Sequence, residues 1–316
     1  MLRTDGYTSF AHAITAHLAP AGSSNTLAVR VNNSGANSRW YSGSGLFRPV
    51  SLISSSSVHL KTFGGAYITT PDVQPAADHT TASATTQVDL LVENTGGSAS
   101  KPVSASVKVF RSDDASRSTV AQAQSSGSGA AIPAGGSLNV SIAIPSTSGL
   151  QTWGPANPVT YTAEISLMAG GEAVQTREEI FGYRSLKFDP KTGFTINGES
   201  MKMYGGCVHH DNGPLGSRAI GRAEERRVEL LKKNGYNAIR TSHNPVSRAF
   251  VQACNKHGVM LMEEAFDCWG KGKNVDDYHL YFEEWWQRDI QSMVLRDRNN
   301  PSIVMWSVSH HHLPLI

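Results

Sequence analysis

Polar side chains gather at the ends of four short apolar runs in the second half of this 316-residue sequence. Each run passes directly into histidine, arginine, acidic, amide or tryptophan residues. The four groups are His209-His210-Asp211, Arg240-Thr241-Ser242-His243-Asn244, Glu263-Glu264-Ala265-Phe266-Asp267-Cys268-Trp269 and Trp306-Ser307. If the runs are parallel strands, their carboxyl ends meet at one edge of the sheet, and these side chains share one site.

Such a set suits the recognition of a sugar. Charged and amide groups bond to hydroxyl groups, and aromatic faces cover the C–H surfaces of the ring. Taken alone, each histidine is more often a satisfied structural group, and Trp269 or Trp306 is more often part of a core. Metal binding by His209, His210 and His243 is a competing interpretation, because imidazoles are common zinc ligands. It requires two adjacent histidines to turn toward one point.

Alternating strands and helices must position these groups. Apolar runs predict strands at 201–208, 238–241, 259–262 and 303–306, and helical spacing predicts helices at 222–234 and 281–297. Asn244 followed by Pro245 predicts the start of another helix, with Asn244 as its N-cap. Four strand–helix steps in succession favour a parallel sheet or barrel.

The first 182 residues have a different pattern. Apolar residues alternate in several short segments, and Ser, Gly and Asn clusters separate them. Examples are Val88, Leu90 and Val92, and the segment 26–31, which ends in a turn signal. Alternation predicts strands that are buried on one face. Several such strands in a row predict antiparallel sandwiches.

Composition narrows the classes of function. The net charge of +2 gives no indication of binding to nucleic acid or to an acidic membrane surface. No apolar run reaches the roughly 18 residues that a membrane-spanning helix needs. The three cysteines, Cys207, Cys254 and Cys268, are widely spaced, which fits buried thiols better than a disulfide framework or a metal motif.

Four long motifs resemble glycoside hydrolase family 2, in the order that the family has them. They are Gly206-Cys207-Val208-His209-His210-Asp211, Asn237-Ala238-Ile239-Arg240-Thr241-Ser242-His243-Asn244-Pro245, Glu264-Ala265-Phe266-Asp267-Cys268-Trp269 and Arg296-Asp297-Arg298-Asn299-Asn300-Pro301-Ser302-Ile303-Val304-Met305-Trp306-Ser307. The subtype that these motifs resemble best is that of the β-galactosidases. The resemblance extends over almost the whole chain.

The resemblance implies a multidomain fold with three parts. Residues 1–67 look like the C-terminal part of a β jelly-roll sugar-binding domain, and 68–182 like an immunoglobulin-like β-sandwich. Residues 183–316 look like the first half of a (β/α)8 TIM barrel, which carries the active site in this family. With only part of the jelly roll and of the barrel present, we expect the sandwich to be the one complete unit.

The resemblance also assigns roles to single residues. His209 and His243 match histidines that contact the sugar near the reacting carbon, and Arg240 matches an arginine that helps to position the nucleophile. Asp267 and Trp269 stand where the family has sugar-contacting groups. The substrate-binding residues that we predict are His209, His210, Arg240, His243, Asn244, Asp267, Trp269 and Trp306. The residues that bind magnesium in some relatives are not matched, so we predict no metal and no cofactor.

The catalytic glutamates of the family have no match in this sequence. In the family the acid/base glutamate belongs to an Asn-Glu pair, which here falls on His310 and His311. The position of the nucleophile lies beyond the last residue. A histidine at position 311 could transfer a proton, but it could not form the glycosyl ester. We therefore assign no catalytic residue and expect no turnover by the chain as written.

No other carboxylates are placed to substitute for this pair. Retaining glycosidases need two carboxyl groups about 5–5.5 Å apart. Glu263 and Glu264 are neighbours in a strand and face opposite sides. Glu264 with Asp267 is possible on paper, but Glu264 has a structural role in this setting.

The expected function is therefore that of part of a retaining exo-β-glycosidase for terminal β-D-galactosides. The alternatives are a relative of β-glucuronidases or β-mannosidases, a non-catalytic carbohydrate-binding protein, or a half that pairs with a complementary C-terminal half. The expected partner is a β-galactoside-containing glycan, and a homo-oligomer is possible. The compartment stays open, because relatives are cytoplasmic or exported.

Overall fold

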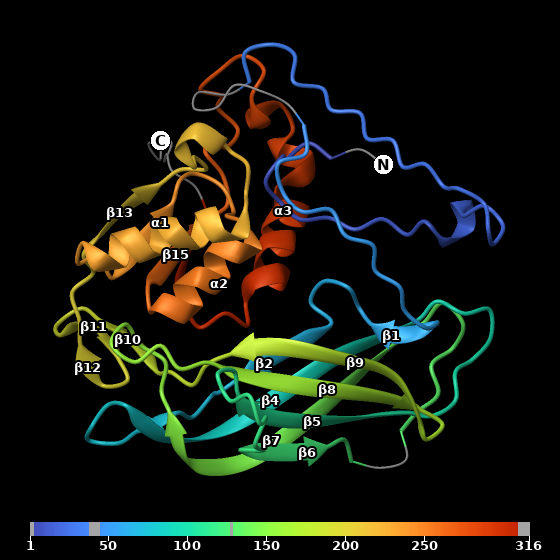
Figure 1. Ribbon diagram of the computed structural model, residues 1–316, viewed down its shortest axis with the longest axis horizontal. Helices are drawn as coiled ribbons and strands as arrows, with labels where there is room; N and C mark the ends of the chain where they lie inside the picture. The colour runs from blue at the N-terminus through green and yellow to red at the C-terminus, as the bar shows by residue number, and fades with distance from the viewer. Residues whose placement is uncertain (1–2, 38–44, 127–128, 309–316) are drawn as a thin grey trace.

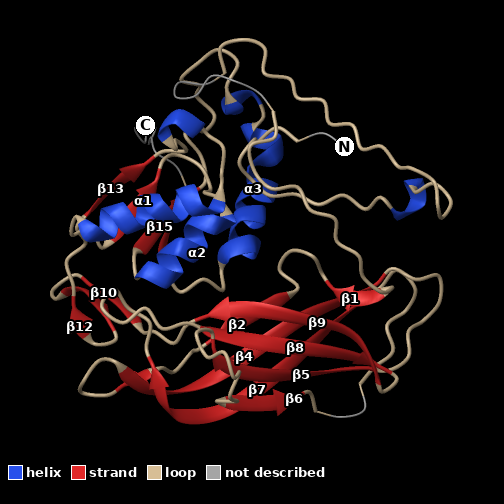
Figure 2. Cartoon of the chain, in the orientation of Figure 1, coloured by secondary structure: helices blue, strands red, loops and turns tan. Residues whose placement is uncertain are grey.

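The computed structural model describes residues 3–37, 45–126 and 129–308. Two units follow an N-terminal segment: an all-strand unit below and a unit with helices above, as Figures 1 and 2 show. No helix in the described ranges combines the length and the hydropathy that crossing a bilayer requires.

The lower unit is a sandwich of two antiparallel sheets. One sheet contains β1 (Val58–Leu60), β2 (Ala66–Thr69), β3 (Gln74–Pro75), β4 (Thr81–Asn94) and β7 (Ser137–Gln151); the other has the order β6 (Ala121–Gln124), β5 (Val103–Arg111), β8 (Tyr161–Ala169), β9 (Glu172–Phe181). One edge of β4 pairs with β7 along almost its whole length, and the other edge pairs in turn with β3, β2 and β1.

The alternation of apolar residues produces the core of this sandwich. Buried and half-buried residues alternate without a break along β4, and one face of β5 and β8 is buried in the same way. Their inward side chains, including Leu90, Val107, Ile142 and Ile165, form one continuous apolar cluster between the sheets. The expectation of an antiparallel sandwich is confirmed; its immunoglobulin-like topology stays a prediction.

The upper unit is a four-stranded parallel sheet with helices in its crossovers. Its strands are β13 (Gly205–Val208), β14 (Ala238–Thr241), β15 (Met260–Glu264) and β16 (Ile303–Ser307), in that spatial order. The helices are α1 (Gly221–Lys233), α2 (Arg248–His257) and α3 (Phe282–Asp297). The short turns of 3-10 helix are η1 (Thr15–His17), η2 (Gly213–Leu215) and η3 (Tyr278–Leu280). This is half of a barrel, as expected.

A small antiparallel sheet connects the two units. It consists of β10 (Leu186–Asp189), β11 (Gly193–Ile196) and β12 (Glu199–Ser200). Side chains from the sandwich also bond directly to the half-barrel: the indole Nε1 of Trp153 donates to Asn255 O at 2.8 Å, and Nη2 of Arg184 donates to Ile303 O at 2.6 Å. Trp153 is fully buried at this junction.

The N-terminal segment differs from the prediction. The strand expected at 26–31 is not formed: Leu27 is 70% exposed, and Val29 and Val31 are exposed as well. Alternation yields a strand only where a neighbouring strand takes up the backbone bonds, and no strand of the described ranges pairs with 26–31.

The partial jelly roll predicted for 1–67 is therefore not a separate sheet in the described residues. The strands of that range, β1 and β2, pair with β4 and so belong to the sandwich sheet. The preceding chain crosses the molecule as an extended segment that passes α3 before it descends to β1 (Figure 1).

The start of α2 also differs from the prediction. The N-cap is Ser247, whose side chain accepts a hydrogen bond from the Phe250 amide at 3.2 Å. Asn244 and Pro245 lie before the helix, in the turn that leaves β14. Asparagine and serine are both favoured N-cap residues, so residue type alone does not fix where this helix begins.

Candidate functional site

The carboxyl ends of β14, β15 and β16 place three polar side chains around the carboxylate of one glutamate. Glu264, the last residue of β15, is fully buried. Arg240 of β14 donates to it with two nitrogens, Nε to Oε2 at 2.6 Å and Nη2 to Oε1 at 3.0 Å. Nδ1 of His243 lies 2.8 Å from Oε1, and the Ser307 hydroxyl donates to Oε2 at 3.0 Å.

The parallel register explains this arrangement. Glu264 is paired with Ser307 across the sheet, and Arg240 is level with Met262, one pleat before Glu264 on the same face. The Thr241 hydroxyl accepts a hydrogen bond from the Glu264 backbone amide at 2.8 Å, which connects the ends of β14 and β15. A bidentate arginine fixes the plane of the carboxylate that it binds. The Glu264 carboxylate therefore sets the orientation of the side chains that bond to it.

The ionisation of Glu264 follows from these bonds. Burial by itself raises its pKa, but hydrogen bonds from His243, Arg240 and Ser307, together with the charge of Arg240, hold the pKa below its usual value. Glu264 is therefore an anion at neutral pH. It fixes the orientation of Arg240 and His243, and both of its oxygens already accept hydrogen bonds.

The neighbouring residue Glu263 faces the opposite side, as the sequence predicts. It accepts from Nη2 of Arg296 at 3.1 Å, and Arg296 also bonds to Asp297 through Nε at 2.6 Å. Burial, and then the charge of Asp297, raise the pKa of Glu263 well above its usual value. One dipeptide thus supplies a carboxylate to the inner face and a second carboxyl group to the helix-covered face.

Two histidines and one aspartate extend the group around Glu264. The rings of His209 and His243 meet edge to face, with centroids 5.1 Å apart. Nε2 of His243 lies 4.0 Å from Oδ1 of Asp267. The same oxygen accepts a hydrogen bond from Nζ of Lys273 at 2.6 Å. We call His209, Arg240, His243, Glu264 and Asp267 the strand-end cluster.

The other predicted site residues lie around this cluster. Trp269 is partly buried, stacks on Phe282 at a centroid distance of 6.3 Å, and donates to Val308 O at 3.2 Å. Trp306 is 40% exposed. It directly precedes Ser307 in β16, so its side chain leaves the opposite face of the sheet. Asn244 is half-buried in the turn after β14.

His210 is directed toward the N-terminal segment. Its ring is buried and stacks on Tyr7 with centroids 4.7 Å apart. Burial, and then the charges of Arg48 and Arg227, lower its pKa well below the usual value, so this imidazole is neutral.

Arg48 and Thr8 hold the N-terminal segment against the half-barrel, and the Thr8 hydroxyl donates to Oδ1 of Asp289 at 3.2 Å. Nη2 of Arg48 donates to Pro245 O at 2.6 Å, and the Tyr7 carbonyl accepts from its Nη1. Burial, and then the charge of Asp289, raise the pKa of Asp5 to about 7. Sequence patterns missed these contacts, because they join positions that are about 200–280 residues apart in the chain.

The structure thus brings together His209, Arg240, His243 and Asp267 from the predicted set. It adds Glu264, Thr241 and Ser307, which the sequence places at the strand ends but not among the predicted substrate-binding residues, and Lys273, which the sequence did not single out. The sequence did contain a signal for Glu264. It stands at the end of a strand predicted to be buried, and a buried carboxylate requires a cationic partner nearby. The predicted acid/base positions, His310 and His311, lie outside the described residues.

Two models of one family match this chain. Residues 66–184 match the model described as "Glycosyl hydrolases family 2", and residues 190–312 match "Glycosyl hydrolases family 2, TIM barrel domain". The matches cover the sandwich and the half-barrel.

Individual proteins agree with these models. The chain is 36% identical over 313 residues to "Beta-galactosidase BoGH2A" of Bacteroides ovatus, covering 99% of this chain and 35% of that protein. It is 30% identical to a "Putative beta-glucuronidase" of Formosa agariphila, covering 98% of this chain and 28% of that protein.

A solved structure agrees as well. A glycosyl hydrolase family 2 member from Bacteroides cellulosilyticus superimposes with a TM-score of 0.77 at 35% identity, over 89% of this chain and 34% of its own. The chain thus spans about a third of the length of such relatives. With two family models, a sandwich and a half-barrel in the expected order, this chain belongs to glycoside hydrolase family 2.

Proposed function

We propose that this chain carries the substrate-binding half of the active site of a retaining β-glycosidase, with terminal β-D-galactosides as substrates. The observation that carries this proposal is the strand-end cluster, in which the buried Glu264 fixes Arg240 and His243 at the carboxyl end of a parallel half-barrel. That end is where barrel enzymes bind their substrates.

The cluster supplies the groups that a sugar needs. The imidazoles of His209 and His243 meet at right angles, and imidazole nitrogens are among the groups that bond to sugar hydroxyls. Asp267 adds a carboxylate acceptor beside them, and Trp269 an aromatic face. Because these side chains are already fixed, they lose little conformational entropy when the sugar binds, and this lowers the free-energy cost of binding. His210 and Asn244 belong to the periphery of this proposed site, whereas Trp306 lies on the other face of β16.

The charge balance favours a neutral hexose over a uronic acid. A glucuronide brings a carboxylate that requires a cation. In the described ranges, the cations that contact carboxylates of the cluster are Arg240, bound to Glu264, and Lys273, bound to Asp267. Because each already compensates an anion, we place β-galactosides ahead of β-glucuronides. The ranking over β-mannosides rests on the sequence motifs.

Hydrolysis with retention requires a nucleophile and an acid/base carboxyl group about 5–5.5 Å apart. Among the described residues, Glu264 cannot be one of them, because Arg240, His243 and Ser307 occupy both of its oxygens. We therefore propose that residues outside the described part of the barrel supply the pair. Within the described sheet, β13 and β16 each pair on one side, so both edges can accept further barrel strands.

The test is binding and hydrolysis measured on the same sample. The chain is titrated by calorimetry with methyl β-D-galactoside, β-D-glucuronide and β-D-mannoside, and is assayed with the three p-nitrophenyl glycosides. We expect the galactoside to bind at least tenfold more tightly than the glucuronide, with no turnover. Preference for the glucuronide would reject the proposed specificity, and hydrolysis that Glu264→Gln abolishes would reject the positioning role of Glu264.

A non-catalytic carbohydrate-binding protein is the second candidate. It rests on the same observation, since the described residues bring sugar-binding groups together without a carboxyl pair. A polypeptide with strands five to eight of a family 2 barrel distinguishes the two. If adding it restores hydrolysis of p-nitrophenyl β-D-galactoside, the chain is half of an enzyme; galactoside binding that persists without hydrolysis favours the second candidate.

A further inference from the structure

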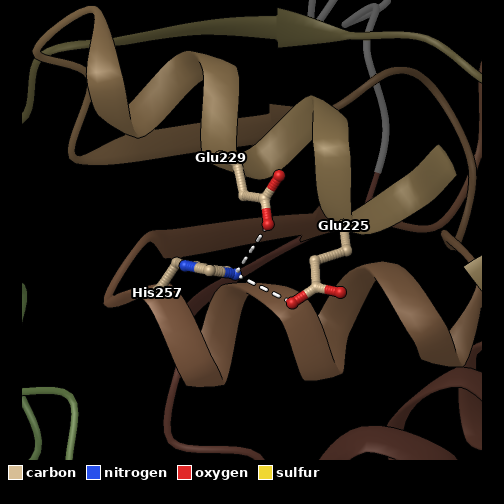
Figure 3. Close-up of side chains that lie close together, drawn as sticks. All are labelled: Glu225, Glu229 and His257. Carbon is tan, nitrogen blue, oxygen red and sulfur yellow. Dashed lines mark hydrogen bonds and ion pairs between the residues drawn. The ribbon is translucent and has the colours of Figure 1, made fainter. Parts of the chain in front are cut away.

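Two glutamates and a histidine converge on the outer surface of the half-barrel, away from the strand-end cluster. Glu225 and Glu229 lie four residues apart on α1, a spacing that places them on one face of the helix. His257 is the last residue of α2, which packs beside α1. Figure 3 shows the imidazole directed at both carboxylates, between the two helices.

The distances suit the ligands of one metal ion. Nε2 of His257 is 3.1 Å from Oε1 of Glu225 and 3.9 Å from Oε1 of Glu229, and the three ligand atoms lie within 4.8 Å of one another. Zinc bonds to imidazole nitrogen and carboxylate oxygen at about 2.0–2.2 Å, so tetrahedral ligand atoms are about 3.4 Å apart. The two distances from His257 to the carboxylates differ from this value by a few tenths of an ångström.

A neighbouring arginine lies beside both carboxylates. Nη2 of Arg222 lies 2.8 Å from Oε2 of Glu229, and its Nη1 lies 3.9 Å from Oε2 of Glu225. Arg222 thus faces the outer oxygen of each carboxylate, while the Oε1 atoms face His257. Because the Arg222 side chain is 64% exposed, its ion pairs add only weakly to this orientation.

From this convergence we propose that Glu225, Glu229 and His257 bind a first-row divalent ion of the zinc type. One imidazole with two carboxylates is a borderline ligand set, which suits zinc better than calcium or magnesium. The three side chains are between 24% and 35% exposed, so water can complete the coordination.

Lys256 competes with the ion at one ligand. Its Nζ bonds to Oε1 of Glu225 at 2.8 Å, the same oxygen that faces His257. The lysine side chain is 68% exposed, and exposed ion pairs of this kind are weak. A bound ion would displace Lys256 and join α1 to α2 through three bonds.

The test is a calorimetric titration of the 316-residue chain with zinc chloride. All variants carry alanine at His310, His311 and His312, so that the histidine tract does not bind the ion. We expect one equivalent to bind, with affinity at least tenfold lower in Glu229→Gln and in His257→Gln, because loss of a supporting group alone costs roughly 10–100-fold. Lys256→Gln should tighten binding, because it removes the competitor.

Two controls distinguish zinc binding between α1 and α2 from zinc binding at another place on the chain. Glu283→Gln removes one surface charge from α3 and should leave zinc affinity unchanged. His243→Gln alters the strand-end cluster and should also leave it unchanged. Absence of binding at millimolar zinc would overturn the proposal, as would binding that survives both ligand variants but disappears in His243→Gln. Cobalt(II) absorption bands typical of tetrahedral sites, lost in the ligand variants, give a second readout.

Discussion

The sandwich and the half-barrel bury their interiors by different physical means. Between the sheets of the sandwich lies one apolar cluster, to which Leu90, Val107 and Ile165 belong. The half-barrel buries apolar residues too, but it also buries Glu263, Glu264 and Asp289, each with a cationic or hydroxyl partner. Apolar burial is non-directional, whereas a buried carboxylate requires particular partners at particular distances. The interior of the sandwich therefore contributes mainly stability, whereas the buried carboxylates of the half-barrel also fix the orientation of side chains.

The largest change in stability should come from the sandwich. Leu90 is 1% exposed, and Leu90→Ala should reduce the free energy of unfolding by roughly 2–5 kcal/mol, through lost burial and a residual cavity. Urea unfolding followed by circular dichroism measures it.

This substitution should leave the strand-end cluster intact. Galactoside affinity measured well below the unfolding midpoint should match that of the parent chain. Affinity that falls together with stability would contradict the separation of the two units.

In the strand-end cluster, one change should lower stability and affinity together. Glu264→Gln keeps the shape of the side chain but leaves Arg240 without its anion, and loss of one partner from a buried pair costs up to roughly 3–5 kcal/mol. Because Arg240 is 26% exposed, we expect about 3 kcal/mol, together with a 10–100-fold loss of galactoside affinity. Denaturant unfolding and calorimetry measure the two effects. Val107→Ala is the matched control: it should destabilise the chain and leave the affinity unchanged.

A pH dependence should appear at the junction of the N-terminal segment. The pKa of Asp5 rises from 3.8 to about 7 on folding, so the docked segment holds the proton more tightly than the undocked one. Docking is therefore strongest at acid pH and weakens as the pH rises from about 4 through about 7.

Asp5→Asn should remove this slope. The amide is neutral at every pH and can still accept the bond from the Tyr7 amide, which is 2.7 Å long. We expect docking to strengthen by up to roughly 4 kcal/mol at pH 8, since the two pKa values differ by about three units and each unit corresponds to about 1.4 kcal/mol. Hydrogen exchange of residues 3–10 at pH 5 and pH 8 measures it. Equal protection of the parent chain at both pH values would contradict the argument.

The smallest effect should come from Ser307. Its hydroxyl donates one bond to Glu264, so Ser307→Ala should cost about 1–2 kcal/mol and weaken galactoside binding only a few-fold. Thermal unfolding and calorimetry check this result. A loss as large as that of Glu264→Gln would mean that Ser307 contacts the sugar itself.

The same contrast explains what the sequence could predict. Alternation along β4 and helical spacing along α3 are local patterns, and the elements lie where these patterns place them. The opposite orientation of Glu263 and Glu264 follows from the pleat alone. Because these features depend on neighbours in the chain, they can be read from short windows.

Features that depend on distant partners were missed. The segment 26–31 alternates but has no strand beside it, so the pattern alone gave a strand that the structure lacks. The stacking of Tyr7 on His210 and the bond from Arg48 to Pro245 O join residues about 200 positions apart. Within the strand-end cluster, the sequence had named His209, Arg240, His243 and Asp267 as candidates, but not the bonds by which Glu264 holds Arg240 and His243.

The central claim is that sugar contacts the strand-end cluster, and histidine side-chain resonances test it most directly. Methyl β-D-galactoside is added to the chain with labelled imidazoles, and signals are assigned through single His→Gln variants. We predict that the signals of His209 and His243 shift in a saturable way, while those of His59 and His257 stay in place. Unchanged His209 and His243 signals at a galactoside concentration that saturates binding would contradict the claim and place the sugar elsewhere.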